Sequence, residues 1–206
     1  KGAILVNAAP RHGMGKKWPN GTPFGYFYYK ETLIVSTIDG YCLSLVKKLG
    51  LINRLYITDV PTVINEMIKQ KLLDPKLRDI IVKSQFRSFD YMPRLAKWLT
   101  EEVSVPHKEY SLDNIIDIPK SIWLVDGFGN CKTTILPHEV KHAPRKILKT
   151  KIGNLTCYDR LKDVPDGKPG LVIGSSGFGL KRFLEIVVQG KSAAEKFKLR
   201  VGSQLL

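Results

Sequence analysis

One stretch, residues 121–135 with the sequence SIWLVDGFGNCKTTI, constrains the fold of this chain more than any other. Its apolar residues 122–125 predict a buried strand, which ends where Gly127 and Gly129 interrupt the pattern. The β-prone residues 133–135 predict a second strand. The stretch therefore predicts a hairpin with a glycine-rich tip.

Polar and aromatic side chains occupy the tip of this predicted hairpin. Asp126, Phe128 and Asn130 alternate with the two glycines, so a carboxylate, an aromatic face and an amide share one closely approachable turn. Such a turn could hold a purine and an ammonium group. An ordinary hairpin in which the Asp and Asn side chains stabilise the turn explains the same residues, and both interpretations stay open.

The order D-G-F-G-N followed by T-T-I resembles a known signature, D-x-F-G-N-x-x-T-N-I. That signature belongs to the S-adenosylmethionine (SAM) hydroxide adenosyltransferase family, whose relatives include the SAM-dependent fluorinase and chlorinase. Residues 174–206 are similar to the closing pattern of the same family, with serine and glycine, then L-E-I and a later S-A-A run. Two motifs in the right order are more specific than either alone.

The resemblance implies a reaction, a set of binding residues and an assembly. Water, or a halide, would displace methionine at the ribose 5′ carbon of SAM and give adenosine, or a 5′-halo-adenosine, plus L-methionine. SAM would be the substrate, no resident cofactor or metal would be needed, and the enzyme would be a homotrimer with sites between subunits. The implied binding residues are Asp126 for the methionine ammonium, Phe128 and Asn130 for adenine or nearby backbone, Tyr158 for the pocket wall, and Ser175 and Ser176 for the carboxylate.

Two positions depart from the family pattern where its hydrolases activate water. Ala9 stands where relatives carry an aspartate before a proline, and Arg87 stands where they carry a histidine. Because alanine cannot orient or deprotonate water, Arg11, His12 and Arg87 are the candidate catalytic residues that remain. A SAM-binding protein without catalysis is the alternative. The first strand of the family and its T-T-D-F-G-like motif find no counterpart, so we expect an N-terminally incomplete domain.

The hydrophobic pattern changes along the chain and predicts two domains. Strand-like and helix-like segments alternate through the first half, which predicts an α/β domain with a mainly parallel sheet and flanking helices over residues 1–114. Residues 104–120 are polar, contain prolines and predict a linker. Short β runs dominate afterwards, which predicts a small β-barrel over residues 115–206.

The charge balance keeps a third function open. Lys and Arg number 33 against 19 Asp and Glu, a net charge of +14 that attracts anions such as nucleic acid. A solvated basic surface explains the same excess. The three cysteines lack C-x-x-C spacing, which argues against a disulfide framework and indicates a reducing, cytoplasmic setting. The first apolar run is too short to span a membrane, so no membrane partner is expected.

A competing motif lies at residues 138–142, where HEVKH matches the H-E-x-x-H pattern of zinc proteases. That chemistry needs a helix that places both histidines on one face beside the glutamate. Pro137 and Pro144 bracket the segment within a β-rich region, so a surface loop is the expected structure.

Overall fold

The computed structural model describes residues 2–8, 18 and 21–206, and the chain divides into two compact units, Lys1–Asp117 and Ile118–Leu206. Each unit has a hydrophobic core of its own. Ile115, which the sequence assigns to the second domain, is buried in the first unit, and its carbonyl accepts a hydrogen bond from Lys47. The candidate residues Ala9, Arg11 and His12 lie outside the described residues.

A five-stranded sheet with the order β1-β3-β2-β4-β5 forms the centre of the first unit. Only β1 and β3 pair in parallel, whereas the other three pairings are antiparallel. The predicted mainly parallel sheet is therefore wrong. The reason is the turn at Lys30 and Glu31, which joins β2 directly to β3 and so makes these neighbours antiparallel. The strands are β1 (Gly2–Val6), β2 (Phe24–Tyr29), β3 (Thr32–Thr37), β4 (Leu55–Thr58) and β5 (Lys108–Tyr110).

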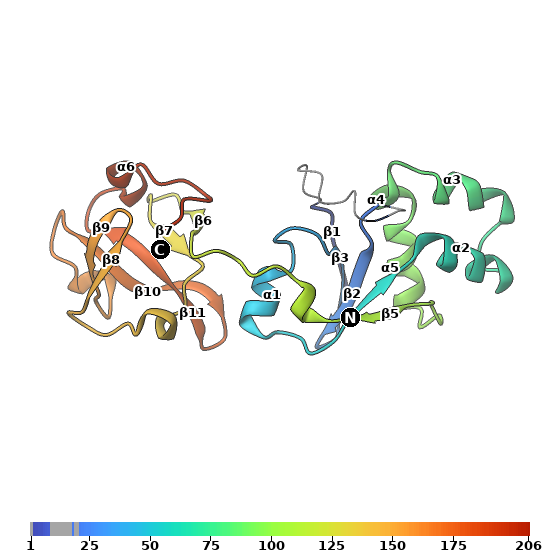
Figure 1. Ribbon diagram of the computed structural model, residues 1–206, viewed down its shortest axis with the longest axis horizontal. Coiled ribbons are helices and arrows are strands. Elements are labelled where there is room, and N and C mark those ends of the chain that lie inside the picture. Colours follow the sequence, from blue (N-terminus) through green and yellow to red (C-terminus); the bar gives the residue numbers. More distant parts are fainter. Residues whose placement is uncertain (1, 9–17, 19–20) are drawn as a thin grey trace. The chain divides into compact units, whose positions relative to one another are not determined.

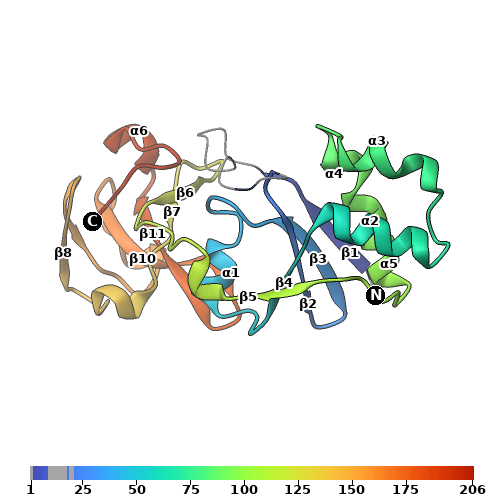
Figure 2. The same ribbon diagram turned by 45° about the vertical axis from the view of Figure 1, so that its right-hand side comes forward.

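Helices cover both faces of this sheet, as the two ribbon views show (Figures 1 and 2). Alternation along β2 explains the two layers: Phe24 and Tyr26 belong to one buried cluster, while Phe27 belongs to the other. The first cluster packs against α2, α3 and α5, and the second packs near α1. The α-helices of this unit are α1 (Ser44–Leu49), α2 (Val60–Lys69), α3 (Arg78–Val82), α4 (Arg87–Asp90) and α5 (Met92–Thr100), with short 3-10 turns at Pro75–Leu77 and Leu112–Asn114.

Two open sheets form the second unit, all of whose residues the structure describes. The larger sheet has the order β10-β11-β7-β6, and the smaller one is the hairpin β8-β9. The predicted closed barrel is therefore wrong for residues 118–206. The elements are β6 (Ile122–Val125), β7 (Cys131–Thr133), β8 (Ile147–Thr150), β9 (Gly153–Thr156), β10 (Pro169–Phe178), β11 (Lys181–Val188) and α6 (Ala193–Phe197), with 3-10 turns at Pro137–Val140 and Leu161–Asp163.

The barrel stays open because the chain leaves the large sheet soon after β7. Pro137 begins a 3-10 turn, and a proline cannot donate a ladder hydrogen bond. The chain then forms the separate hairpin β8-β9, and the bridge between Cys157 and Leu171 links its end to β10. Between the sheets lies a core that includes Ile122, Leu155 and Ile186.

Candidate functional site

The predicted hairpin is present, with β6 and β7 joined by the turn of residues 126–130, but its second strand is Cys131–Thr133 and not residues 133–135 as predicted. The carboxylate of Asp126 organises this turn from inside. Its Oδ1 atom accepts hydrogen bonds of 3.0 Å from the backbone N–H groups of Phe128 and Asn130. Its Oδ2 atom accepts a longer bond of 3.3 Å from the Asn130 side chain. Asp126 therefore stabilises the turn, as the simpler interpretation of the sequence requires.

The same contacts set the protonation state of Asp126. Burial by itself raises the pKa of this carboxyl, but the hydrogen bonds from Asn130, Phe128 and Lys132 outweigh burial and leave the pKa below its ordinary value. Asp126 is therefore ionised at neutral pH. A fixed negative charge therefore sits under the tip of the hairpin.

A buried ammonium group lies next to this carboxylate. The Nζ atom of Lys132 is 3.4 Å from Asp126 Oδ2, 2.9 Å from Glu185 Oε2 and 3.4 Å from Ser175 Oγ. The four residues come from the turn, β7, β10 and β11, so strands distant in sequence meet at one nitrogen. Burial lowers the pKa of Lys132, but the hydrogen bond and charge of Glu185, helped by Asp126, raise it above its ordinary value.

Beside the turn lies a groove of about 550 Å³, within the size range of small-molecule sites. Phe128 contributes an aromatic face that is 84% exposed. Asn130 and Gln189 contribute two carboxamides, and carboxamides can pair with the edge of a purine. The remaining lining residues are Leu161, Val188, Gly190, Lys191 and Ser192. The groove thus combines a stacking surface with donors and acceptors suited to a base.

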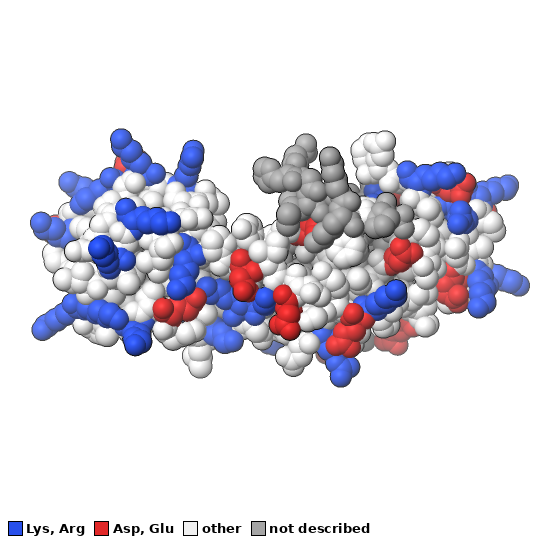
Figure 3. All heavy atoms as spheres, in the orientation of Figure 1, with Lys and Arg blue, Asp and Glu red and all other residues white. Residues whose placement is uncertain are grey.

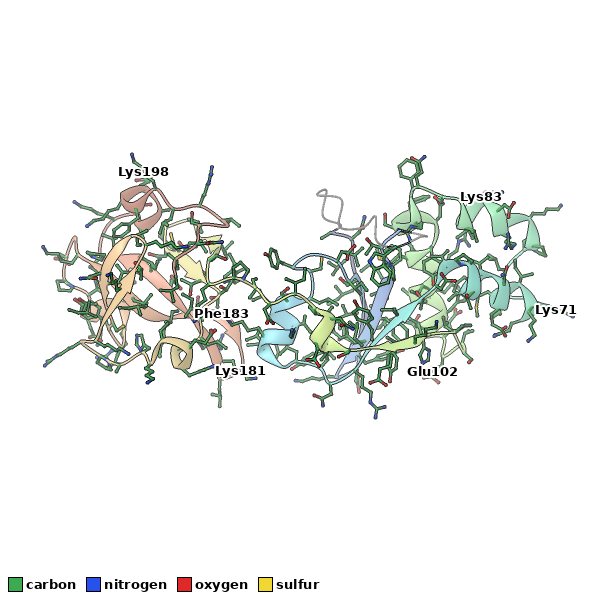
Figure 4. All side chains as sticks on the ribbon, in the orientation of Figure 1. Lys71, Lys83, Glu102, Lys181, Phe183 and Lys198 are labelled. Atoms are coloured by element: carbon green, nitrogen blue, oxygen red, sulfur yellow. The ribbon has the colours of Figure 1, made fainter. Side chains whose placement is uncertain are left out.

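Ser175 and Ser176 lie in an irregular stretch of β10 where the pairing register with β11 shifts. The stretch faces Phe183, which is buried and labelled in Figure 4. Ser175 is exposed, and its carbonyl accepts a bond of 2.9 Å from Arg182. The Oγ atom of Ser176 is buried without a hydrogen-bond partner. Bulges of this kind often re-aim side chains beside binding sites.

Tyr158 lies apart from the groove-lining residues. Its ring packs against a small cluster of Val164, Val172 and Val187. A Cβ added at Gly170 would meet the ring at 2.9 Å, so the glycine makes room for it. The structure therefore places Tyr158 as a packing residue of the second unit.

Arg87 belongs to the first unit and begins α4. Its guanidinium lies 5.9 Å from the centre of the Phe24 ring and packs on Gly21, beside a cavity of about 150 Å³. Burial lowers the pKa of Arg87 below its ordinary value. Within the described part of the chain it forms no ion pair with a carboxylate. Arg87 is thus a half-buried cation that an anion in this cavity could contact.

The H-E-x-x-H segment has a structural explanation. Residues 137–140 form a 3-10 turn, and Glu139 accepts a bond of 2.6 Å from the backbone N–H of Leu136. His142 lies 3.4 Å from the carbonyl of Leu171. No group of His, Cys, Asp and Glu that could hold a metal occurs among the described residues. None of the helices there has the length and apolar character needed to cross a bilayer.

Three residues of this region were not identified from the sequence: Lys132, Glu185 and Gln189. The register of the sheet brings the first two together, because Lys132 and Glu185 are direct partners across β7 and β11. The available signal was Glu185, a charged residue within the apolar run of β11. Gln189 follows β11 in a tight turn closed by a bond from Lys191 to Val188, and nothing in the sequence marks it.

The groove and the hairpin beside it define a candidate nucleoside-binding element. Residues 120–206 match the family model of the SAM hydroxide adenosyltransferase C-terminal domain. This match covers nearly the whole second unit but fewer than half of the residues of the chain, and it supports a place in that family.

Solved structures share the fold of the whole chain. An uncharacterized conserved protein from Thermotoga maritima is 15% identical with a TM-score of 0.62, over 99% of this chain and 76% of that one. A conserved hypothetical protein from Thermus thermophilus is 19% identical with a TM-score of 0.56, over 99% and 74%. At these identities the likeness concerns the fold alone. No curated protein gives a significant match.

Proposed function

We propose that this chain is a member of the SAM hydroxide adenosyltransferase family that binds SAM and transfers its adenosyl group to water or a halide. The observation that carries the proposal is the position of Phe128 and Asn130. Both belong to the segment that matches the family model, and both line the 550 Å³ groove. In the proposed complex, adenine stacks on Phe128 and pairs with the amide of Asn130.

The methionine end would meet the charged residues next to the turn. Asp126 Oδ2, whose two contacts are longer than those of Oδ1, would receive the methionine ammonium. Ser175, already 3.4 Å from the ammonium of Lys132, would receive the carboxylate together with Ser176, whose buried hydroxyl has no partner. The zwitterionic methionine end would then place its ammonium at the carboxylate of Asp126 and its carboxylate near the ammonium of Lys132.

The proposed reaction is a single displacement. The nucleophile forms a bond to the ribose 5′ carbon while the bond between that carbon and sulfur breaks. The electron pair of the broken bond stays on sulfur and converts the sulfonium into the neutral thioether of methionine. Water then releases a proton, and a halide has none to release. Because the leaving group needs no proton, catalysis depends on placing a partly desolvated nucleophile in line with the breaking bond. Arg11, His12 and Arg87 are the proposed residues for this task, and a homotrimer is the proposed assembly.

The test is a mass-spectrometric time course of SAM with the whole chain, in chloride-free buffer and again with chloride. Equal amounts of adenosine and methionine establish hydrolysis, and a 5′-chloro product establishes halide transfer. SAM that binds but survives intact in both buffers identifies a binding protein without catalysis. SAM that neither binds nor reacts contradicts the proposal.

A matched pair of variants tests the groove itself. Phe128→Ala removes the stacking face, and we expect SAM and adenosine affinity to fall by about tenfold or more. Leu180→Ala removes a fully exposed apolar side chain from the β10-β11 turn of the same unit, outside the groove lining. Affinity should not change in this control. Equal affinity in all three proteins would remove Phe128 from the site.

A second function, binding of nucleic acid, is favoured by the charge of the second unit. Residues 118–206 contain 16 Lys and Arg against 7 Asp and Glu, and basic side chains spread over the face of this unit in Figure 3. Exposed Arg145, Lys149 and Lys198 form no ion pair within this fully described unit. Affinity for a polynucleotide that falls steeply with salt would support this function, and absence of binding at low salt would exclude it.

A further inference from the structure

Lys132 and Glu185 form an ion pair across two neighbouring strands. They are direct partners in the register of β7 and β11, and the contact of 2.9 Å is well within ion-pair range. Their side chains are 11% and 8% exposed, so the pair is shielded from water and salt. The residues that flank them on the same strands, Cys131 and Ile186, point into the hydrophobic core instead.

The pair has an unequal charge balance once Asp126 is included. Two carboxylates contact one ammonium, and the Asp126 side chain is only 22% exposed. Without the ammonium, Asp126 and Glu185 would be two nearby negative charges with poor hydration, an arrangement that proteins avoid. The ammonium of Lys132 lies within ion-pair distance of both carboxylates and offsets their repulsion.

The position of Asp126 in turn determines the shape of the groove edge. Its Oδ1 atom holds the backbone N–H groups of Phe128 and Asn130, and both residues line the groove. A shift of this carboxylate would release both amides together. The chain of contacts therefore runs from Glu185 through Lys132 and Asp126 to the two groove residues.

We infer that Lys132 is a positioning residue, which keeps the 126–130 turn in its ligand-binding shape by offsetting the charge of Glu185 beside Asp126. Lys132 acts on the ligand through the turn. A test by adenosine affinity rests on the proposed function, whereas a test by hydrogen exchange at the turn amides does not depend on any ligand.

The experiment compares the whole chain with three variants: Lys132→Met, Lys132→Met combined with Glu185→Gln, and the control Lys149→Met. Lys149 is exposed and has no ion pair within its fully described unit. The first readout is hydrogen exchange, followed by NMR, at the amides of Phe128 and Asn130. The reference is the Leu184 amide, which bonds to the carbonyl of Ile135 at 2.8 Å. The second readout is adenosine affinity.

In Lys132→Met, exchange at the two turn amides should accelerate by about tenfold or more relative to wild type, and adenosine affinity should fall similarly. Leu184 should exchange as in wild type. The added Glu185→Gln should restore both readouts, because it removes the repulsion.

Each outcome either supports or overturns the role of Lys132 as a positioning residue. Turn amides that exchange as in wild type in Lys132→Met overturn the inference, and so does a double variant whose turn amides stay fast or whose second unit does not fold. If Lys132→Met itself does not fold but the double variant folds with wild-type exchange, the inference is supported. If wild-type protein binds neither adenosine nor SAM, the proposed function fails, while the exchange readout still tests Lys132.

Discussion

The backbone carbonyl of Gly129 accepts a hydrogen bond of 2.9 Å from the backbone N–H of Ala194. This bond joins the 126–130 turn to the start of α6. Gly129 has a φ of +78°, and a Cβ added to it would lie 2.1 Å from the hydroxyl oxygen of Ser192. The turn and the helix are therefore in direct backbone contact, with no room for a side chain at position 129.

Gly129→Ala should lower the stability of the second unit by about 2–4 kcal/mol, because it adds a left-handed backbone penalty to a steric clash. Gly127→Ala is the matched control, since a Cβ there meets nothing within 4 Å. Chemical unfolding followed by circular dichroism measures both. Equal stabilities for the two variants would contradict the close contact between turn and helix.

Acid should remove the contribution of Asp126 to stability. The folded pKa of this carboxyl is below its ordinary value, so its stabilising effect is present above the unfolded pKa of about 3.9 and is lost as pH falls through the folded pKa. Wild type should therefore exceed Asp126→Asn in stability at neutral pH, and the difference should shrink below about pH 4. A difference that does not change with pH through this range would show that the pKa of Asp126 is the same in the folded and unfolded protein, and that its ionised form is not favoured by folding.

The buried thiols should resist modification in the folded protein. Cys131 and Cys157 are 0% and 1% exposed, and burial raises the pKa of both thiols. Cys42 is half-buried. Titration with Ellman's reagent at mildly alkaline pH should therefore modify no thiol other than Cys42 until denaturant is added. Rapid reaction of Cys131 or Cys157 in native protein would mean that the core of the second unit opens readily.

Tyr91→Phe should destabilise the first unit. The Tyr91 hydroxyl donates a bond of 2.9 Å to Thr58 Oγ1, which donates a bond of 3.2 Å to the carbonyl of Phe24. Because Tyr91 is fully buried, the loss of its hydroxyl should cost about 1–2 kcal/mol. Tyr41→Phe, at a position 56% exposed, is the control and should be neutral within error. Urea unfolding of the three proteins makes the comparison.

Local features of this chain were predictable from its sequence, and long-range ones were not. The hairpin around residues 122–133 depends on a few consecutive residues, and its presence and first strand were predicted correctly, although its second strand starts two residues earlier than predicted. The strand β5, with the polar sequence KEY, was taken as linker because pairing with β4, not its own composition, makes it a strand. The antiparallel sheet was missed for a related reason, since alternation of helices and strands does not reveal strand order.

The candidate site shows the same division. Phe128 and Asn130 were proposed from their motif, and both line the same groove, while their role as binding residues stays a prediction. The ion pair of Lys132 and Glu185 joins residues more than fifty positions apart, so only the sheet register reveals it. Tyr158 was proposed as a pocket-wall residue from the family resemblance. The sequence did not reveal its packing, because the valines that surround it come from separate segments of the chain.

The contacts that shape the 126–130 turn, from Asp126 to Ala194, all come from residues 118–206. Residues 1–117 form a core of their own, and the departures Arg87 and Ala9 both belong to them. Under the proposed function, the residues for ligand recognition and those for placing the nucleophile therefore belong to different units of the chain. A lineage could exchange one nucleophile for another, or lose catalysis, by mutation in the first part of the gene while the second part kept its selected sequence.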